Sequence, residues 1–292
     1  MTYITADTAL PAAPTKPGRA RDFLRRNPMI VAGGILLAVM AAVALAAPWI
    51  TGDPIEIDPV NRLKPPSAAY WFGTDHLGRD IYTRAIHGAR ISLLVGLSVA
   101  TISIAIGLAI GLAAGYVRWL DGPVMRVMDG LMAIPAILLA IGLIALNKAS
   151  VGIVIFAITI PEIPRVVRLV RAVVLTVREQ LFVEAAIAGG MRRWRIVLRH
   201  ILPSTIAPLV VQATYVCGSA ILIEAGLSFL GAGTPPEIPT WGNMIASSRV
   251  YLQIAPWALF TPSVLLAITV LAVNLLGDGL RDRLDPRIAR RM

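Results

Sequence analysis

Long apolar runs alternate along the chain with short polar segments, and the length of these runs decides the fold class. Each run is near or above the ~20 residues with which a helix crosses the hydrocarbon core of a bilayer. The runs are continuously apolar, whereas the strands of a membrane barrel alternate in polarity over ~10 residues. The pattern therefore predicts an all-α integral membrane protein with about six transmembrane helices, at roughly 29–50, 91–117, 131–147, 151–171, 205–232 and 255–277.

Composition agrees with this class, since 57% of the 292 residues are hydrophobic and 15% are charged. The mean hydropathy of +0.73 is well above that of ordinary soluble domains. We predict a cytoplasmic N-terminal tail, a first transmembrane helix, an extracytoplasmic loop, a membrane domain and a cytoplasmic C-terminal tail, in the order 1–28, 29–50, 51–87, 88–278 and 279–292.

Arginines define the orientation. They gather in both tails, at 118–126 and at 165–200, which six crossings place on one side of the membrane. Loops rich in Lys and Arg stay in the cytoplasm. Both termini are therefore predicted to be cytoplasmic. The net charge of +10 follows membrane sidedness and does not indicate a nucleic-acid partner.

Three glycines within the second apolar run are spaced four residues apart. Gly107, Gly111 and Gly115 fall on one helical face. Small residues at this spacing let two helix backbones approach closely in lipid. We therefore predict that this face packs against another helix.

The segment "VEAAIAGGMRRWRIVLRHILP" (183–203) is too charged to cross a bilayer. At helical spacing, Ile187, Met191, Trp194 and Leu198 form one apolar stripe. Gly189 and Gly190 each weaken helix propensity by about 1 kcal/mol relative to Ala. The prediction is a short helix, a turn and a second short helix on the membrane surface, ended by Pro203 before the fifth span.

The sequence lacks the marks of an enzyme. It contains neither a phosphate-binding G-x-x-x-x-G-K-[ST] loop nor a zinc-binding H-E-x-x-H. His76, His87 and His200 lie on separate segments, so we expect no catalytic residues, no metal site and no cofactor on this chain.

Two polar residues at membrane depth are candidates for the path of a transported solute. Glu224 has no cation within a helical turn, and Asn274 lies in the last apolar run. An ionisable residue inside a membrane is a functional candidate by default, and a satisfied contact with another helix is the alternative. Glu162 is expected to pair with nearby Arg165, and Asp129 is expected to be structural.

The 183–203 segment resembles the EAA loop of ATP-binding-cassette (ABC) importer permeases. The matching positions are Glu184, Ala185, Ala186, Gly190, Leu202 and Pro203. His200 replaces the aliphatic residue of the general pattern, and "RHILP" is similar to the second permease of dipeptide and oligopeptide importers. "FGTDHLGRDIYTRAIHGARISLLVG" (72–96), "EAGLSFLGAGTPPEIPTWGNMI" (224–245) and "NLLGDGLRDRLDPR" (274–287) resemble signatures of the same subfamily.

The resemblance implies a type-1 importer permease fold in a bacterial inner membrane, with residues 184–203 forming a cytoplasmic coupling helix. It implies four partners, namely a homologous second permease, two ABC ATPase subunits that bind ATP and Mg²⁺, and an extracytoplasmic solute-binding protein. Met191, Trp194 and Leu198 would then contact an ATPase. The implied cargo is a dipeptide or oligopeptide, with glutathione, an opine or a nickel chelate as alternatives.

The outer segments 72–80 and 235–245 contain three candidate docking residues for the binding protein, Arg79, Asp80 and Trp241. Outer loops are the only parts of a permease that such a protein can reach, and ordinary loop packing is the alternative. A self-sufficient secondary transporter is a competing function, although no convincing internal repeat supports it. A membrane-embedded enzyme is disfavoured by the scattered histidines.

Overall fold

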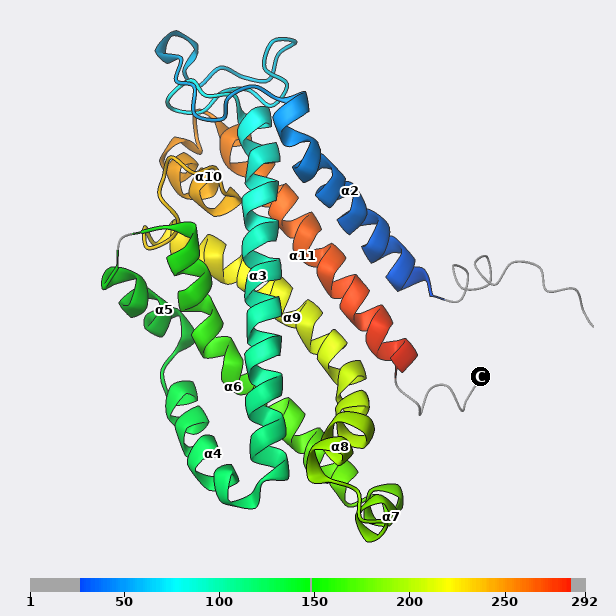
Figure 1. The fold of residues 1–292 in the computed structure, drawn as a ribbon. Helices are drawn as coiled ribbons and strands as arrows, with labels where there is room; N and C mark the ends of the chain where they lie inside the picture. The colour runs from blue at the N-terminus through cyan, green and yellow to red at the C-terminus, as the bar shows by residue number, and fades with distance from the viewer. Residues whose placement is uncertain (1–26, 148, 285–292) are drawn as a thin grey trace, which may run out of the picture.

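The computed structural model describes residues 27–147 and 149–284, and within these ranges the secondary structure is helical (Figure 1). The helices are α2 (Pro28–Ile50), η1 (Pro59–Asn61), α3 (Ile81–Tyr116), α4 (Arg118–Ala133), α5 (Ala136–Ala145), α6 (Val151–Arg178), α7 (Leu181–Ala188), α8 (Arg193–Ile196), the π-helical turn η2 (Val197–Ile201), α9 (Leu202–Phe229), α10 (Trp241–Ser248), η3 (Arg249–Tyr251) and α11 (Pro256–Leu284).

Four helices in the described part of the chain are long and apolar enough to cross a membrane. They are α2, α3, the continuous helix Arg193–Phe229 that contains α9, and α11. The pair α4 and α5 qualifies as a fifth only if it is treated as one span bent by 86°. α6 has sufficient length, but Glu162, Arg165 and Arg168 interrupt its apolar run.

The span predicted at 131–147 is not one continuous helix, because the chain breaks between α4 and α5. α5 has ten residues, which extend about 15 Å and cannot cross a bilayer. Pro135 is the cause, because proline disfavours helical backbone at the residue before it. Ile134 is accordingly extended, and the chain turns there. Six crossings result only if α6 and the bent pair both cross, so the predicted count stays a prediction.

Two further predicted boundaries differ from the helices. The outer loop ends at Asp80 instead of residue 87, because the Asp80 carboxylate caps α3 by accepting from the backbone N–H groups of Tyr82 and Thr83. At the other end, α11 continues past residue 278 to Leu284. The predicted 1–28 tail, apart from its last two residues, and the last eight residues of the 279–292 tail lie outside the described residues.

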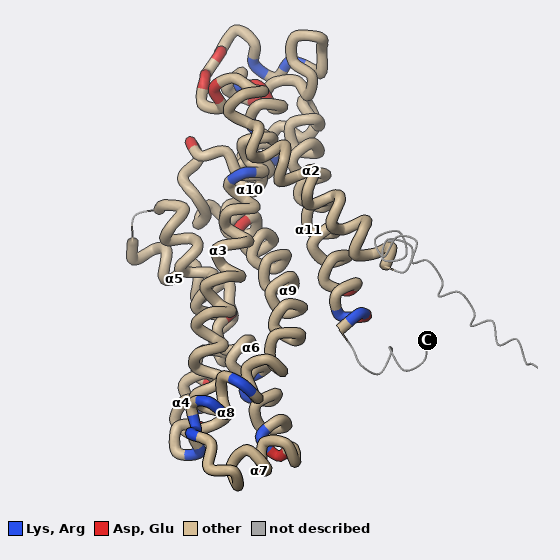
Figure 2. The backbone as a smooth tube through the Cα atoms, turned by 45° about the vertical axis from the view of Figure 1, so that its right-hand side comes forward, with Lys and Arg blue, Asp and Glu red and all other residues tan. Residues whose placement is uncertain are grey.

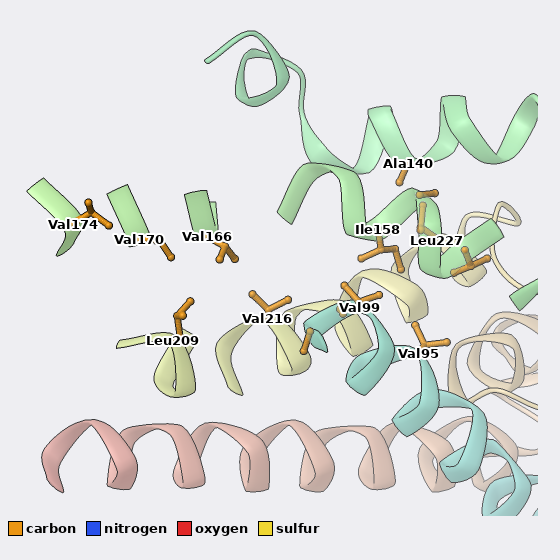
Figure 3. Packing of buried hydrophobic residues seen from close by; sticks show 14 of the residues in the cluster. Val95, Val99, Ala140, Ile158, Val166, Val170, Val174, Leu209, Val216 and Leu227 are labelled. Atoms are coloured by element: carbon orange, nitrogen blue, oxygen red, sulfur yellow. The ribbon is translucent and has the colours of Figure 1, made fainter. Parts of the chain in front are cut away.

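The centre of the fold is the contact between α3 and α6, and it confirms the glycine prediction. A Cβ added at Gly107, Gly111 or Gly115 would lie 2.5, 2.6 or 2.7 Å from the Cβ of Val166, Val170 or Val174, respectively. Only glycine permits such an approach. Figure 3 shows the three valines in a row on α6, within a core that α3 and α9 complete.

Charged residues lie mainly at the two ends of the bundle, and the middle is largely free of them (Figure 2). At the end opposite the outer loop, α4 is bound to α6 by two ion pairs. Arg171 donates to both oxygens of Asp121, at 2.5 and 2.7 Å, and Arg168 pairs with Asp129. The structural role expected for Asp129 is confirmed, and these pairs hold the bent α4 against the core.

Candidate functional site

The segment with the EAA-like motif lies at the end of the bundle opposite the outer loop (Figure 1). We call residues 181–203 the coupling segment. It comprises α7, an irregular linker at 189–192, α8 and η2, and it continues into the first turn of α9. The predicted order of short helix, turn and short helix is confirmed.

A Schellman motif ends α7. The backbone N–H of Gly190 donates to the carbonyl of Ile187 at 3.0 Å, and that of Met191 donates to Ala186 at 3.1 Å. Gly190 has a φ of 75°, a region that costs a residue with a Cβ about 1–2 kcal/mol. Open space surrounds the position. The requirement for glycine is therefore conformational, and it explains the spacing from Ala186 to Gly190.

We expect Gly190→Val to reduce transport severely and Gly190→Asn to retain most of it. A β-branched residue is strained at positive φ, whereas Asn tolerates it. The strain of about 1–2 kcal/mol would open the turn and displace α7. ATP-driven uptake by the two variants, compared at equal membrane content, measures the effect. Equal activity of the two variants would show that transport does not depend on the left-handed turn at Gly190.

The coupling segment has one buried and one exposed side. Val183, Ile196 and Ile201 are buried in the main core and attach the segment to the bundle. On the other side, Trp194 is 55% exposed and Leu198 is 52% exposed. These two side chains, with Met191, Arg195 and Arg199, line a groove open to the exterior. The groove combines apolar side chains with two arginines, and the Arg195 guanidinium lies 5.2 Å from the centroid of the Trp194 ring.

The single predicted stripe is wrong in its geometry. Ile187 lies on α7 before the Gly190 turn, while Trp194 and Leu198 lie after it, so they do not share one helix. Pro203 also does not end the segment. It sits in the first turn of α9, and Arg193–Phe229 is one continuous helix. The preceding residues widen into the π-turn η2, with the N–H of Leu202 reaching the carbonyl of Val197, which accommodates the missing proline N–H.

The remaining motif residues are divided, since Ala186 is half-buried against the main core while Glu184 and Ala185 are exposed. Glu184 is exposed in the first turn of α7, where a carboxylate is stabilised by the helix dipole. Ala185 is exposed beside it, and Leu202 is half-buried at the start of α9. None of these side chains is placed for covalent chemistry. The segment instead presents an exposed surface, which its buried side chains attach to the bundle.

Glu224 lies inside the subunit and is fully buried near the outer end of α9. Its Oε1 accepts from the Ser228 hydroxyl at 2.9 Å. The hydroxyls of Thr234 and Thr240 are near the carboxyl, whose Oε2 is buried without a hydrogen-bond partner in the described chain, and Asn243 donates to Thr234 at 2.9 Å. Glu224 thus connects α9 to α10 through a buried polar cluster. Its predicted role in the path stays a prediction.

Asn274 is exposed on α11 and lines a groove with polar residues of α9. Its Oδ1 would lie 3.5 Å from a Cβ at Gly218, so α9 and α11 are close together at this level. Its side chain is exposed at the groove beside α9, and its predicted role in the path stays a prediction.

The three predicted docking residues are used within the fold. Arg79 is 7% exposed and donates to Asp75 at 2.7 Å. Asp80 caps α3. Trp241 is fully buried, and its Nε1 donates to the carbonyl of Ala85 at 3.0 Å. Side chains buried in this way offer almost no contact area, so any docking role would act through the shape of the outer surface. That role stays a prediction.

The loop before α3 contains a histidine, His76, whose pKa is lowered by its surroundings. His76 stacks on Tyr251, with ring centroids 5.4 Å apart. Burial lowers the pKa of His76 below its ordinary value, and Arg79, Arg84 and Arg62 act in the same direction against Asp75. Below a pH of about 6.5, the unfolded chain binds a proton that the folded loop resists. Stability is therefore present above this pH and is lost as the pH falls towards the lowered pKa.

We expect His76→Gln to flatten the decline in thermal stability on acidification, because it removes this titrating group. Melting temperatures of the purified protein and the variant, compared at neutral and mildly acidic pH, provide the test. Parallel pH profiles would show that His76 contributes nothing to the acid sensitivity.

The chain is similar to known proteins in sequence and in fold. A family model described as "binding-protein-dependent transport system inner membrane component" matches residues 103–290, and a model of the N-terminal transmembrane domain of oligopeptide transport permease C matches residues 18–66. This chain belongs to the family of binding-protein-dependent inner-membrane permeases. The resemblance seen in the sequence is confirmed, and the permease is a multi-pass membrane protein.

Two relatives and one solved structure illustrate the similarity. A probable peptide ABC transporter permease of Sinorhizobium fredii is 60% identical over 267 residues, which cover 91% of this permease and 92% of the relative. A dipeptide transport system permease of Alkalihalophilus pseudofirmus is 44% identical, with 91% and 88% covered. The inward-facing MetNI methionine ABC transporter matches with a TM-score of 0.57 at 20% identity, covering 69% of the permease and 96% of that chain. This match shows the type-1 importer permease fold.

Sequence analysis missed two groups of residues in this site. Val183, Ile196 and Ile201 attach the coupling segment, but single apolar residues in a charged segment carry little signal. Asp278 and Arg281 line the same groove as Asn274. Their spacing of i, i+4 and i+7 from Asn274 could have placed all three on one helical face.

Proposed function

We propose that the permease is one of two membrane subunits of an ATP-driven importer and forms part of the path for peptides that a solute-binding protein delivers. The observation that carries the proposal is the 60% identity to a probable peptide permease along 91% of the chain. ATP and Mg²⁺ would bind to two partner ATPases, and a homologous permease would complete the path. Both termini of the permease would be cytoplasmic.

The coupling segment would be the contact for an ATPase. Its exposed apolar side chains have no covering element in the described chain, and their burial in a partner would release them from water. α8, η2 and α9 form one helix from Arg193 to Phe229. A displacement of Trp194 would therefore move α9 as a whole. The other end of this helix holds Glu224, so the ATPase cycle could reach the outer cluster through a single rigid element.

At the outer end, the binding protein would contact exposed side chains of the loop and of η3. Trp71 is 65% exposed and Val250 is 78% exposed. Arg79, Asp80 and Trp241 would support this surface from beneath.

Reconstitution tests the function. The permease, its sister permease, the ATPases and the binding protein would be placed in liposomes, and uptake of labelled dipeptides and oligopeptides would be measured with ATP and with a non-hydrolysable analogue. We expect uptake only with ATP and binding protein. Transport of glutathione, an opine or a nickel chelate in place of peptides would correct the cargo. Uptake by the permease alone would favour a secondary transporter.

A further inference from the structure

A groove with both polar and apolar lining residues runs between α9 and α11 in the half of the bundle nearer the coupling segment. It has a volume of about 600 Å³, and Gln212, Tyr215, Asn274, Asp278 and Arg281 line it. Close contacts fix how the two helices align. Gly277 lies against Thr214, because a Cβ at Gly277 would be 2.3 Å from the Thr214 hydroxyl. The groove is therefore a built feature of the α9–α11 contact.

The exposed face of α11 changes character along its length. Phe260, Val264 and Leu271 are 57%, 52% and 54% exposed, and they form the half nearer the outer loop. The same face continues through Asn274 and Asp278, which are also exposed. An apolar half can face lipid or another apolar helix. A polar half at membrane depth faces water or a polar partner, because lipid offers it no hydrogen bonds.

The polar side chains of the groove have donor and acceptor groups that make no hydrogen bond within the described chain. Within the described chain, Gln212, Asn274, Asp278 and Arg281 have no side-chain hydrogen bond or ion pair to another residue. A side-chain amide both donates and accepts hydrogen bonds, as a peptide group does. Asp278 and Arg281 add opposite charges, which suit an ammonium and a carboxylate. The groove thus matches the main chain and the two termini of a peptide, independently of its side chains.

We propose that this groove is the permease's own wall of the translocation path on the cytoplasmic side, and that its amide and charged groups contact the main chain of the transported peptide. This proposal rests on the proposed import function, and it assigns residues and ligand chemistry to it. Asn274 is the central group, since it lies where α11 changes from apolar to polar.

Cysteine labelling tests the water-filled groove in the complete importer. The single native thiol is removed by Cys217→Ser, and cysteines are introduced one at a time as Gln212→Cys and Asn274→Cys. The controls are Val264→Cys, on the apolar half of α11, and Val210→Cys, which is exposed on α9 but does not line the groove. Val210 is nearer than Gln212 to the cytoplasmic end of α9, so it controls for depth alone.

A hydrophilic maleimide added from the cytoplasmic side should modify the two groove cysteines on the order of tenfold faster than the controls, because the reactive thiolate forms in water. A high concentration of peptide on that side should slow the labelling of the groove cysteines. Equal rates at all four positions, or faster labelling of Val210→Cys, would overturn the groove as a path. Fast labelling without protection by peptide would overturn the contact with cargo.

The rate of peptide uptake provides the second measurement. Asn274→Leu should lower the rate of peptide uptake severalfold while leaving ATPase assembly intact, and Asn274→Gln should restore much of it. Normal uptake by Asn274→Leu would contradict the proposal. Two failures can be distinguished. If the import function is wrong, the Cys217→Ser importer does not transport peptide. If only the groove proposal is wrong, transport is intact and the groove cysteines stay unlabelled.

Discussion

Gly111→Leu is expected to abolish folding of the permease, because it places a side chain where two helices are already in contact. Even the first added carbon would lie 2.6 Å from the Cβ of Val170 and 3.0 Å from the carbonyl oxygen of Val167. Overpacking in a tight core commonly costs about 1–3 kcal/mol, and more where backbone atoms obstruct the new group. α3 and α6 would have to separate along their central contact. The yield of monodisperse protein in detergent and its melting temperature measure the loss.

Gly142→Leu is a matched control for this prediction. Gly142 also lies within an apolar helix, α5, but a Cβ there meets nothing within 4 Å. It should leave yield and melting temperature close to those of the wild type. A compensating pair sharpens the test, since Val170→Gly should partly rescue Gly111→Ala by removing the opposing Cβ, which is the atom 2.6 Å away. If Gly111→Leu and Gly142→Leu gave equal yields, the close approach of α3 and α6 would be refuted.

Features with a local physical cause could be predicted from the sequence. The glycine spacing at 107, 111 and 115 indicated a close helix contact, because a fourfold period places residues on one face. The turn at Gly189 and Gly190 followed from helix propensity. Glu162 pairs with Arg165 at 2.9 Å, as its spacing of three residues suggested.

Features set by distant contacts could not be predicted. Trp241 is buried by a contact with Ala85, 156 residues away, and nothing near residue 241 shows this. Pro135 is present in the sequence, but the continuous apolar run on both sides of it indicated one transmembrane span. The stripe through Ile187 and Trp194 assumed one continuous helix, and the left-handed backbone at Gly190 breaks it. The error concerns geometry, because Trp194 is still exposed in the coupling segment.

Trp194→Ala is expected to weaken attachment of the ATPases and to lower ATP-driven uptake, while the permease itself still inserts and folds. Trp194 is the largest exposed apolar side chain of the groove on the coupling segment. Buried aromatic anchors at protein interfaces commonly cost at least about 2 kcal/mol when truncated, which is roughly 30-fold in affinity. In the free permease the side chain is 55% exposed, so its removal leaves little cavity. Trp194→Ala should therefore weaken ATPase binding without lowering the thermal stability of the permease.

Trp119→Ala is the control for the loss of an exposed tryptophan near the same end of the bundle. Trp119 is 75% exposed on α4 and lies outside the coupling segment. Co-purification of ATPase subunits with each variant, followed by peptide transported per ATP hydrolysed in proteoliposomes, compares the two. We expect Trp119→Ala to retain both and Trp194→Ala to lose both, with equal melting temperatures. If Trp194→Ala keeps its ATPases and its coupling ratio, the apolar side of the segment faces lipid, and force from the ATPases must enter the permease elsewhere.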